Sequence, residues 1–336
     1  MKDDGVLMAS GCVRFEKWTA QGNSFVIVAG SRAPGYSEGT LRALSLRSCS
    51  PHFGLGADNL LLIELQDAQS DRRGEFRMIE PDGSEAAMCG NGLGCAAAML
   101  ACRDEAPQAS LLFGVAASTS KPMDCRVIVE RRDDVWAFEI DLGAVEAPPD
   151  EFLDPAGHLL KPIGSTSVFD VTEIVAPILS EIRTPEGLPL LATIVYTGEP
   201  HLVLLEEPRA VPTDAIQIQA TGDLLNERLR ELLPKGINVM SASLIDGEIR
   251  YRSYERNLFR ETLSSSTGAA AIAVSIVARG LRGKNEVLEF VPLGATIPQA
   301  RLGSERFAQW ATVSESGVRV GSYGRRLAAG ELTPPW

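Results

Sequence analysis

The stretch MCGNGLGCAAAML occupies Met88–Leu100 and is the segment from which the rest of this sequence can be interpreted. Cys89 is followed by a glycine-rich turn and then by an alanine-rich run, which predicts a helix that begins near Asn91. A side chain at a helix start lies beside unpaired backbone N–H groups and the positive end of the helix dipole. That position favours a thiolate, so Cys89 is a candidate reactive residue. The alternative is a small residue packed at a helix N-terminus.

Length and charge set the broad class of the protein. A chain of 336 residues fits two domains of ordinary size. Its net charge of −12 argues against nucleic acid and anionic membrane surfaces as partners. No apolar run reaches the roughly 18 residues that a membrane span needs. The first residues, MKDDGVLMASG, lack the apolar core of a signal peptide, so we expect residues 1–12 to form a flexible extension.

Cysteine and histidine usage indicates reduced thiols and gives no sign of a metal site. All six cysteines lie in the first 125 residues, which argues against a disulfide framework and predicts a cytoplasmic location. The chain has three histidines and neither a CxxC nor an HExxH motif, so we expect no metal. The GNGLG sequence at Gly90–Gly94 is neither GxGxxG nor a GK[ST] phosphate loop, so we also expect no nucleotide cofactor.

The order of sequence features in the first half recurs in the second. Four segments match in order and spacing, and they pair Gln21–Phe25 with Thr197–His201, Gly56–Leu60 with Gly236–Met240, Phe76–Glu80 with Tyr251–Glu255, and Cys89 with Ser265. We therefore predict two copies of one α/β unit that face each other across a cleft. The domains are expected at residues 13–146 and 147–317, with the first completed by a strand near 318–331 and the crossing in the proline-bearing segment Ala147–Lys161.

Ser265 stands at the start of a second alanine-rich helix, predicted over Ala269–Arg279 with Gly280 as its C-cap. Each copy thus places a residue of reactive type at a helix start. Two helix N-termini on one cleft would make an anion site suited to a carboxylate. The alternative for Ser265 is that its hydroxyl only caps the helix.

These motifs resemble those of the diaminopimelate epimerase family, the cofactor-independent racemases and epimerases related to proline racemase. Seven motifs occur in family order, and they are GNSF (Gly22–Phe25), FGLGAD (Phe53–Asp58), DGSEAAMCGNG (Asp82–Gly92), GEPH (Gly198–His201), INV (Ile237–Val239), YER (Tyr254–Arg256) and ETLSSSTGA (Glu261–Ala269). The resemblance implies an α/β (α+β) fold of two pseudo-symmetric domains. Each would be a curved, mostly antiparallel sheet or barrel around a central helix, with the active site in the cleft between them.

The resemblance also implies a mechanism and a set of site residues. In the family, one cysteine thiolate removes the α-proton while a cysteine thiol on the opposite side delivers another, without a cofactor. Cys89 matches the first cysteine, and Ser265 stands where the second is expected. Backbone N–H groups at both helix starts would stabilise the developing charge. By the same resemblance, the positions that contact substrate in the family, some with the family residue and some with another, are here Asn23, Asn59, Glu80, Gly90, Asn91, Glu199, His201, Asn238, Glu255, Arg256, Ser266 and Thr267.

The serine at position 265 leaves three mechanisms open, because a hydroxyl is a much weaker acid and base than a thiol near neutral pH. Ser265 or a relayed water could reprotonate the carbanion, so that slow epimerisation persists. Cys89 could instead act as the single base of a lyase, a dehydratase or a double-bond isomerase. In the third case the pocket has lost its chemistry and only binds a ligand.

Other departures from the family pattern bear on the substrate. Glu80 and Glu199 stand where the family has asparagines, and two carboxylates would repel a distal carboxylate and favour a cation or a hydroxyl donor. Gly94 replaces an arginine of the family motif. The linker Asn257–Arg260 is one residue longer and bulkier than usual, so we expect it to reshape the pocket.

The sequence as a whole predicts a cofactor-independent isomerase that acts at the α-carbon of a small amino acid or related carboxylate. A role in a specialised pathway is favoured over authentic diaminopimelate epimerisation. We expect a small-molecule partner, no nucleic acid and no membrane, and we allow for a homodimer.

Overall fold

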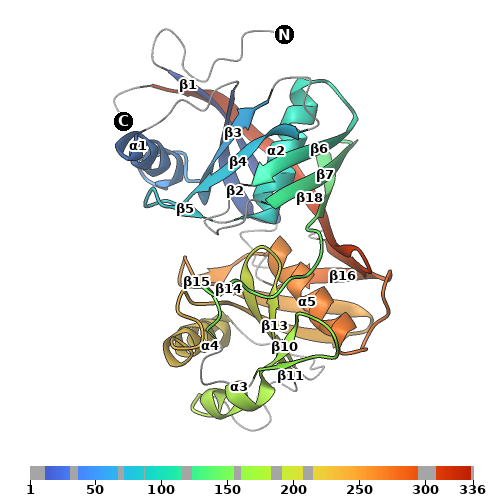
Figure 1. Ribbon diagram of the computed structural model, residues 1–336. Coiled ribbons are helices and arrows are strands. Elements are labelled where there is room, and N and C mark those ends of the chain that lie inside the picture. Colours follow the sequence, from blue (N-terminus) through green and yellow to red (C-terminus); the bar gives the residue numbers. More distant parts are fainter. Residues whose placement is uncertain are drawn as a thin grey trace. The chain divides into compact units, whose positions relative to one another are not determined.

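The computed structural model describes residues 12–30, 37–66, 72–86, 88–115, 123–154, 160–182, 191–206, 215–293 and 308–333 (Figure 1). The predicted N-terminal extension, apart from Cys12, lies outside these ranges. Contacts divide the chain into a first unit, Met1–Asp141 with Gly321–Trp336, and a second unit, Leu142–Val320. The chain therefore changes unit at residues 141/142 and 320/321, a few residues from the expected 146/147 and 317/318.

The first unit contains two helices and most of the N-terminal strands. Its elements are β1 (Val13–Ala20), β2 (Asn23–Gly30), α1 (Glu38–Cys49), β3 (Asn59–Leu65), β4 (Arg72–Ile79), β5 (Glu85–Ala86), α2 (Gly90–Arg103), β6 (Gln108–Val115), β7 (Met123–Arg132), β8 (Val135–Asp141) and the later part of β18 (Gly317–Leu332).

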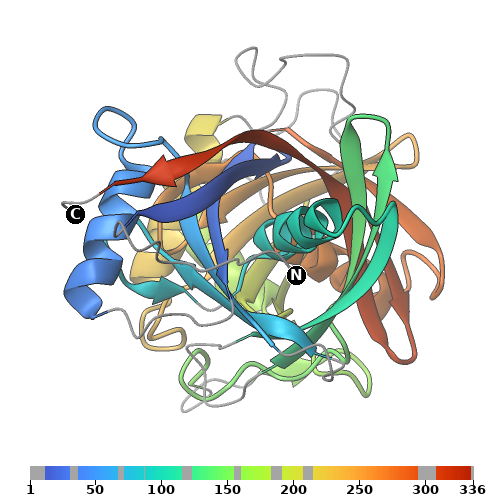
Figure 2. The ribbon, with the colours of Figure 1, turned by 90° about the horizontal axis from the view of Figure 1, so that it is seen from above.

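Eight strands of the first unit close into a barrel. The sequence-adjacent antiparallel pairs β1–β2, β3–β4, β6–β7 and β7–β8 are joined by the parallel pairs β2–β3 and β4–β6. β18 then pairs with both β8 and β1, which completes the ring. Helix α2 contacts strands on several sides of this barrel, and Figure 2 shows it among them. The predicted curved sheet around a central helix is confirmed.

The second unit repeats this plan with one more strand and one more helix. Its elements are β9 (Lys161–Pro162), β10 (Phe169–Asp170), α3 (Thr172–Leu179), β11 (Leu191–Tyr196), β12 (Pro200–Leu205), α4 (Ala215–Arg228), β13 (Asn238–Ile245), β14 (Glu248–Glu255), β15 (Arg260–Thr262), α5 (Ser266–Ala278), β16 (Val287–Pro292), β17 (Gln309–Ser314) and the beginning of β18.

The internal repeat is visible in the strand pairing. The series β1–β2, β2–β3, β3–β4, β4–β5, β4–β6, β6–β7 recurs as β11–β12, β12–β13, β13–β14, β14–β15, β14–β16, β16–β17, with the same directions. Phe25 pairs with Asn59 in the first unit, and His201 pairs with Asn238 in the second. The turn glycines Gly22 and Gly198 also share a left-handed backbone, with φ of 88° and 86°. This register assigns equivalent positions residue by residue.

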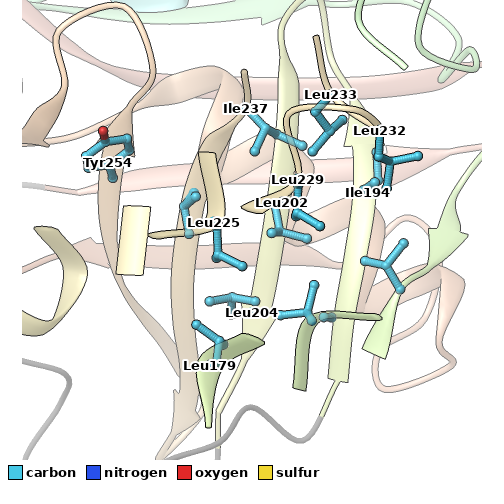
Figure 3. Packing of buried hydrophobic residues seen from close by; sticks show 14 of the residues in the cluster. Leu179, Ile194, Leu202, Leu204, Leu225, Leu229, Leu232, Leu233, Ile237 and Tyr254 are labelled. Carbon is cyan, nitrogen blue, oxygen red and sulfur yellow. The ribbon is translucent and has the colours of Figure 1, made fainter. Parts of the chain in front are cut away.

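Strand β12 of the second unit is buried because helices cover both faces of the sheet here. On β12, Leu202 and Leu204 belong to a core cluster with Leu225 of α4 (Figure 3), whereas His201 points to the start of α5. β12 consequently has no exposed residue and carries apolar side chains on nearly every position. The central helix α5 lies on one face of these strands, and α3 and α4 lie on the other.

The sequence analysis did not predict α3 or α4. Helix α4 reads AIQIQATGDLLNER, where glutamines interrupt the apolar pattern and a glycine lies in the middle. It is stabilised by packing, since its Gly222 lies against the ring of Tyr254 and Leu225 is fully buried. None of the helices in the described part of the chain has the length and apolar character of a membrane span.

Candidate active site

Cys89 is the N-cap residue of α2, with an extended backbone (φ −139°, ψ 114°). Its carbonyl accepts the first helical hydrogen bond from Leu93 N at 2.9 Å. Among the described residues, no capping hydrogen bond reaches its sulfur. Gly90 and Asn91 are the first two helical residues, so their N–H groups belong to the unpaired first turn. The half-buried sulfur therefore lies at the positive end of the helix.

Two side-chain hydrogen bonds of the first unit bring predicted site residues together. The side-chain nitrogen of Asn91 donates to Oδ1 of Asn23, at 3.2 Å, from the first turn of α2 to the β1–β2 hairpin. Asn59 Nδ2 donates to Glu80 Oε2 at 2.8 Å, which links the start of β3 to the end of β4. Asp58, which was not predicted, accepts from Ser24 N at 2.7 Å and thereby ties the starts of β2 and β3.

Ser265 is the N-cap residue of α5 and has nearly the same backbone as Cys89, with φ −143° and ψ 118°. Its carbonyl accepts from Ala269 N at 2.9 Å, as the Cys89 carbonyl does from Leu93 N. The difference lies in the side chain, because Ser265 Oγ accepts from Gly268 N at 3.2 Å. The predicted capping role of Ser265 is thus present, and its hydroxyl hydrogen can still donate.

Tyr251 holds the start of α5 from the neighbouring strand. Its hydroxyl accepts from Ser265 N at 3.0 Å and donates to the side-chain oxygen of Gln309. Burial raises the pKa of Tyr251, so the phenol stays neutral. The register places Phe76 at the equivalent position of the first unit, where no hydroxyl is present. Tyr251 was noticed in the sequence only as part of the repeat.

His201 is fully buried behind the first turn of α5. Its Nδ1 donates to the carbonyl of Glu199 at 2.8 Å, so its Nε2 accepts from the hydroxyl of Thr267 at 3.3 Å. Burial lowers the pKa of His201 to about 4, and the guanidinium of Arg256 contributes in the same direction. The ring is neutral near pH 7. Thr197 adds a second anchor, because its hydroxyl donates to the Thr267 carbonyl at 2.9 Å.

Glu199 and Arg256 form a buried ion pair. Arg256 Nη2 and Nε donate to Glu199 Oε2 at 2.8 and 3.2 Å, and the two side chains are only 8–9% exposed. Arg256 also donates from Nη1 to the Lys235 carbonyl and lies over the ring of Phe152, 5.0 Å from its centre. Asn238 fixes the backbone here by accepting from Arg256 N at 3.0 Å.

This pair changes how Glu199 can act on a ligand. The charge of Glu199 is compensated within the chain by Arg256, so the carboxylate can act on a ligand only together with that guanidinium. The sequence could not reveal this, because Arg256 follows Glu199 by 57 residues and lies on another element. The carboxylate of Glu80 accepts from the side-chain amide of Asn59. Glu255 ends β14, and its carbonyl accepts from Leu258 N in the following turn.

Gly94 lies in close contact with a core aromatic ring. A Cβ atom at this position would lie 2.4 Å from the ring of Phe138, so no side chain fits without moving a core aromatic residue. Gly94 lies within α2, and Phe138 lies on β8. The small residue therefore allows the central helix to approach the barrel wall.

The other thiols differ from Cys89 in their surroundings. Burial raises the pKa of Cys49 to about 11 and that of Cys125 to about 12, and it raises the pKa of Cys95 well above the ordinary value. Cys102 is half-buried in the last turn of α2. Among the described residues, no group of three or more His, Cys, Asp or Glu is arranged to hold a metal ion. His158 lies outside those residues.

Each unit thus places one of the two N-cap residues, Cys89 or Ser265, at the start of its central helix. The sequence profile described as diaminopimelate epimerase matches residues 15–121. The diaminopimelate epimerase of Moorella thermoacetica is 30% identical over 267 residues, which cover 78% of this chain and 83% of that protein. The chain belongs to the diaminopimelate epimerase family.

Solved structures agree with this assignment at the level of the fold. A predicted epimerase from Pseudomonas aeruginosa matches with a TM-score of 0.64 and 18% identity, covering 96% of this chain and 99% of that one. A probable proline racemase from Agrobacterium radiobacter, with bound carbonate, matches with a TM-score of 0.61 and 15% identity, covering 96% and 93%. The curated relatives that match in sequence are diaminopimelate epimerases, so the class is that of an isomerase.

Proposed function

We propose that the protein is a cofactor-independent isomerase that removes and returns a proton at the α-carbon of an amino acid or related carboxylate. The observation that carries this proposal is the equivalence of the two helix starts. Cys89 and Ser265 are N-cap residues with backbone angles within 4° of each other, on central helices of repeated units. A pair of such starts suits a substrate whose carboxylate binds the first-turn N–H groups.

In the proposed reaction, the thiolate of Cys89 takes the α-proton and becomes a thiol. The electron pair left on the α-carbon is delocalised into the carboxylate, where N–H groups of the first helical turns stabilise the added charge. Ser265, or a water that it binds, then donates a proton to the opposite face. Exchange with solvent returns Cys89 to the thiolate and Ser265 to the hydroxyl. Because the serine is the weaker partner, we expect slow turnover and a role in a specialised pathway rather than authentic diaminopimelate epimerisation.

A second candidate is a lyase, dehydratase or double-bond isomerase in which Cys89 is the only base. The bond from Gly268 N to Ser265 Oγ favours it, because this bond occupies a lone pair of the hydroxyl oxygen and makes Ser265 a weaker base. In this case the carbanion either expels a β-substituent or takes its proton back at another carbon of a conjugated system.

Incubation of the protein with a panel of amino acids in D2O distinguishes these functions. The readouts are α-deuterium incorporation by mass spectrometry and chiral analysis of the product. Exchange with inversion supports the epimerase, exchange with retention supports a single base, and loss of water or ammonia supports the lyase. The Ser265→Cys variant should increase inversion if the site is otherwise competent. If wild type shows neither exchange nor turnover and Ser265→Cys does not restore them, the catalytic proposal fails and a ligand-binding role remains.

A further inference from the structure

The Glu199–Arg256 ion pair has no counterpart at the equivalent position of the first unit. The strand register makes Asn23 the equivalent of Glu199, since Phe25 and His201 occupy the same place in β2 and β12. Asn23 is a neutral amide that accepts from another amide, Asn91. The second unit instead has a carboxylate and a guanidinium side by side, both about nine-tenths buried.

The pair lies next to the start of α5. The backbone of Glu199 is bonded to His201, and His201 is bonded to Thr267 in the first helical turn. Arg256 is held on three sides, by Glu199, by the Lys235 carbonyl and by the ring of Phe152. A guanidinium fixed in this way keeps its position when its carboxylate partner is exchanged for another carboxylate.

We propose that Glu199 is a specificity-determining residue. Its carboxylate occupies Arg256, so this guanidinium does not bind a carboxylate of the substrate. The substrate therefore carries a single carboxylate. A ligand with a second carboxylate near Arg256 would meet an already neutralised guanidinium and would place two carboxylates side by side. This inference rests on the proposed function, in that the ligand is taken to bind at the start of α5.

The second carboxylate oxygen of Glu199, Oε1, indicates which group the far end of the substrate carries in place of a carboxylate. The two bonds that Arg256 donates to Glu199 both go to Oε2, and the described residues provide no donor to Oε1. A substrate side chain that is apolar or ends in a hydroxyl or ammonium donor is compatible with this oxygen, whereas a carboxylate is not.

Carboxylate rescue tests the state of Arg256 without any substrate. In Glu199→Ala, removal of the carboxylate leaves a buried guanidinium and a space that acetate can fill. We expect acetate to raise the melting temperature of Glu199→Ala and to have no such effect on wild type or on the charge-free control Glu199→Ala/Arg256→Met. Glu199→Ser, which also removes the carboxylate and leaves space for acetate, replaces Glu199→Ala if the alanine variant does not fold. Equal acetate effects on all three proteins would overturn the proposal.

Two amino acids of equal chain length then test substrate choice by calorimetry. 2-Aminopimelate ends in a carboxylate, and 2-aminoheptanoate ends in a methyl group. We expect Glu199→Gln to bind 2-aminopimelate about tenfold more tightly than wild type does, with 2-aminoheptanoate changed much less. Equal affinity of wild type and Glu199→Gln for 2-aminopimelate contradicts the proposal. The proposed isomerase activity fails separately, through absence of α-exchange, since the acetate and affinity measurements do not require turnover.

Discussion

The starts of α2 and α5 share a backbone and differ in almost every side chain around it. At α5, the Ser265 hydroxyl caps the helix, Tyr251 holds the Ser265 amide, and His201 holds Thr267. At α2, Phe76 and Phe25 stand where Tyr251 and His201 do. The second start is thus fixed through Ser265 and Thr267, whereas the first is joined to its neighbouring hairpin through Asn91 and presents a thiol that does not serve as a cap. From equal geometry with unequal chemistry, we expect the two ends to have different tasks.

Removing the thiol should give the largest effect. We expect Cys89→Ala to lower the rate of α-deuterium exchange by a factor of about 10²–10⁴, the usual contribution of a positioned base. The matched control is Cys102→Ala at the other end of the same helix, which should change the rate little. An exchange rate that survives in Cys89→Ala would remove Cys89 from the mechanism.

The ion pair of the second unit should account for the next largest effect. Arg256→Met leaves the Glu199 carboxylate buried without its partner, so we expect the free energy of unfolding to fall by about 3–5 kcal/mol. The double variant Glu199→Gln/Arg256→Met should recover most of this loss, because a neutral amide then stands there as Asn23 does in the first unit. Urea denaturation measures both, and equal stability of single and double variants would be inconsistent with a coupled pair.

His201 should make the second unit sensitive to acid in a way that Phe25 cannot. Its pKa is about 4 in the folded protein, against 6.5 for an unperturbed histidine, so well above pH 6.5 neither the folded nor the unfolded state binds the proton. Between pH 6.5 and 4 the unfolded chain takes up a proton that the folded protein excludes, which costs about 3 kcal/mol of stability by pH 4. The loss of stability that protonation of Asp170 causes begins at lower pH, because the pKa of this carboxyl is lowered from 3.8 to about 2.

The measurement is the free energy of unfolding in urea at pH 7 and at pH 4.5, for wild type and for His201→Asn. The asparagine does not titrate, and its side chain retains a donor and an acceptor. The free energy of unfolding of His201→Asn should fall less than that of wild type between these two pH values. A fall of equal size in both proteins would assign the acid sensitivity to other groups.

The smallest effect concerns the helix caps themselves. Ser265→Ala removes the bond to Gly268 N and should lower the free energy of unfolding by about 1 kcal/mol. Cys89→Ala removes no capping bond among the described residues, so its loss of stability should be smaller. If Cys89→Ala is the more destabilising of the two, the distinction between a capping and a non-capping side chain is wrong.

Much of this architecture could be predicted because it rests on local sequence. The alanine-rich helices after Cys89 and Ser265, the glycine turns at Gly22 and Gly198, and the recurring order of motifs are all short-range signals. Helix α4 could not be predicted, because Gly222 in its middle is explained only by the ring of Tyr254. The pairing of Glu199 with Arg256 and the fit of Gly94 against Phe138 join distant segments, and only the folded chain brings them together.

The most direct test of the asymmetry is to exchange the two residues. In the variant Cys89→Ser/Ser265→Cys the backbone of each helix start stays the same, and only the thiol changes sides. For a chiral amino acid that wild type exchanges in D2O, we expect wild type to exchange the α-proton of one enantiomer faster. The swapped variant should prefer the opposite enantiomer, because the stronger base then faces the other side of the α-carbon. An unchanged enantiomer preference would contradict the assignment of Cys89 as the base and Ser265 as its weaker partner.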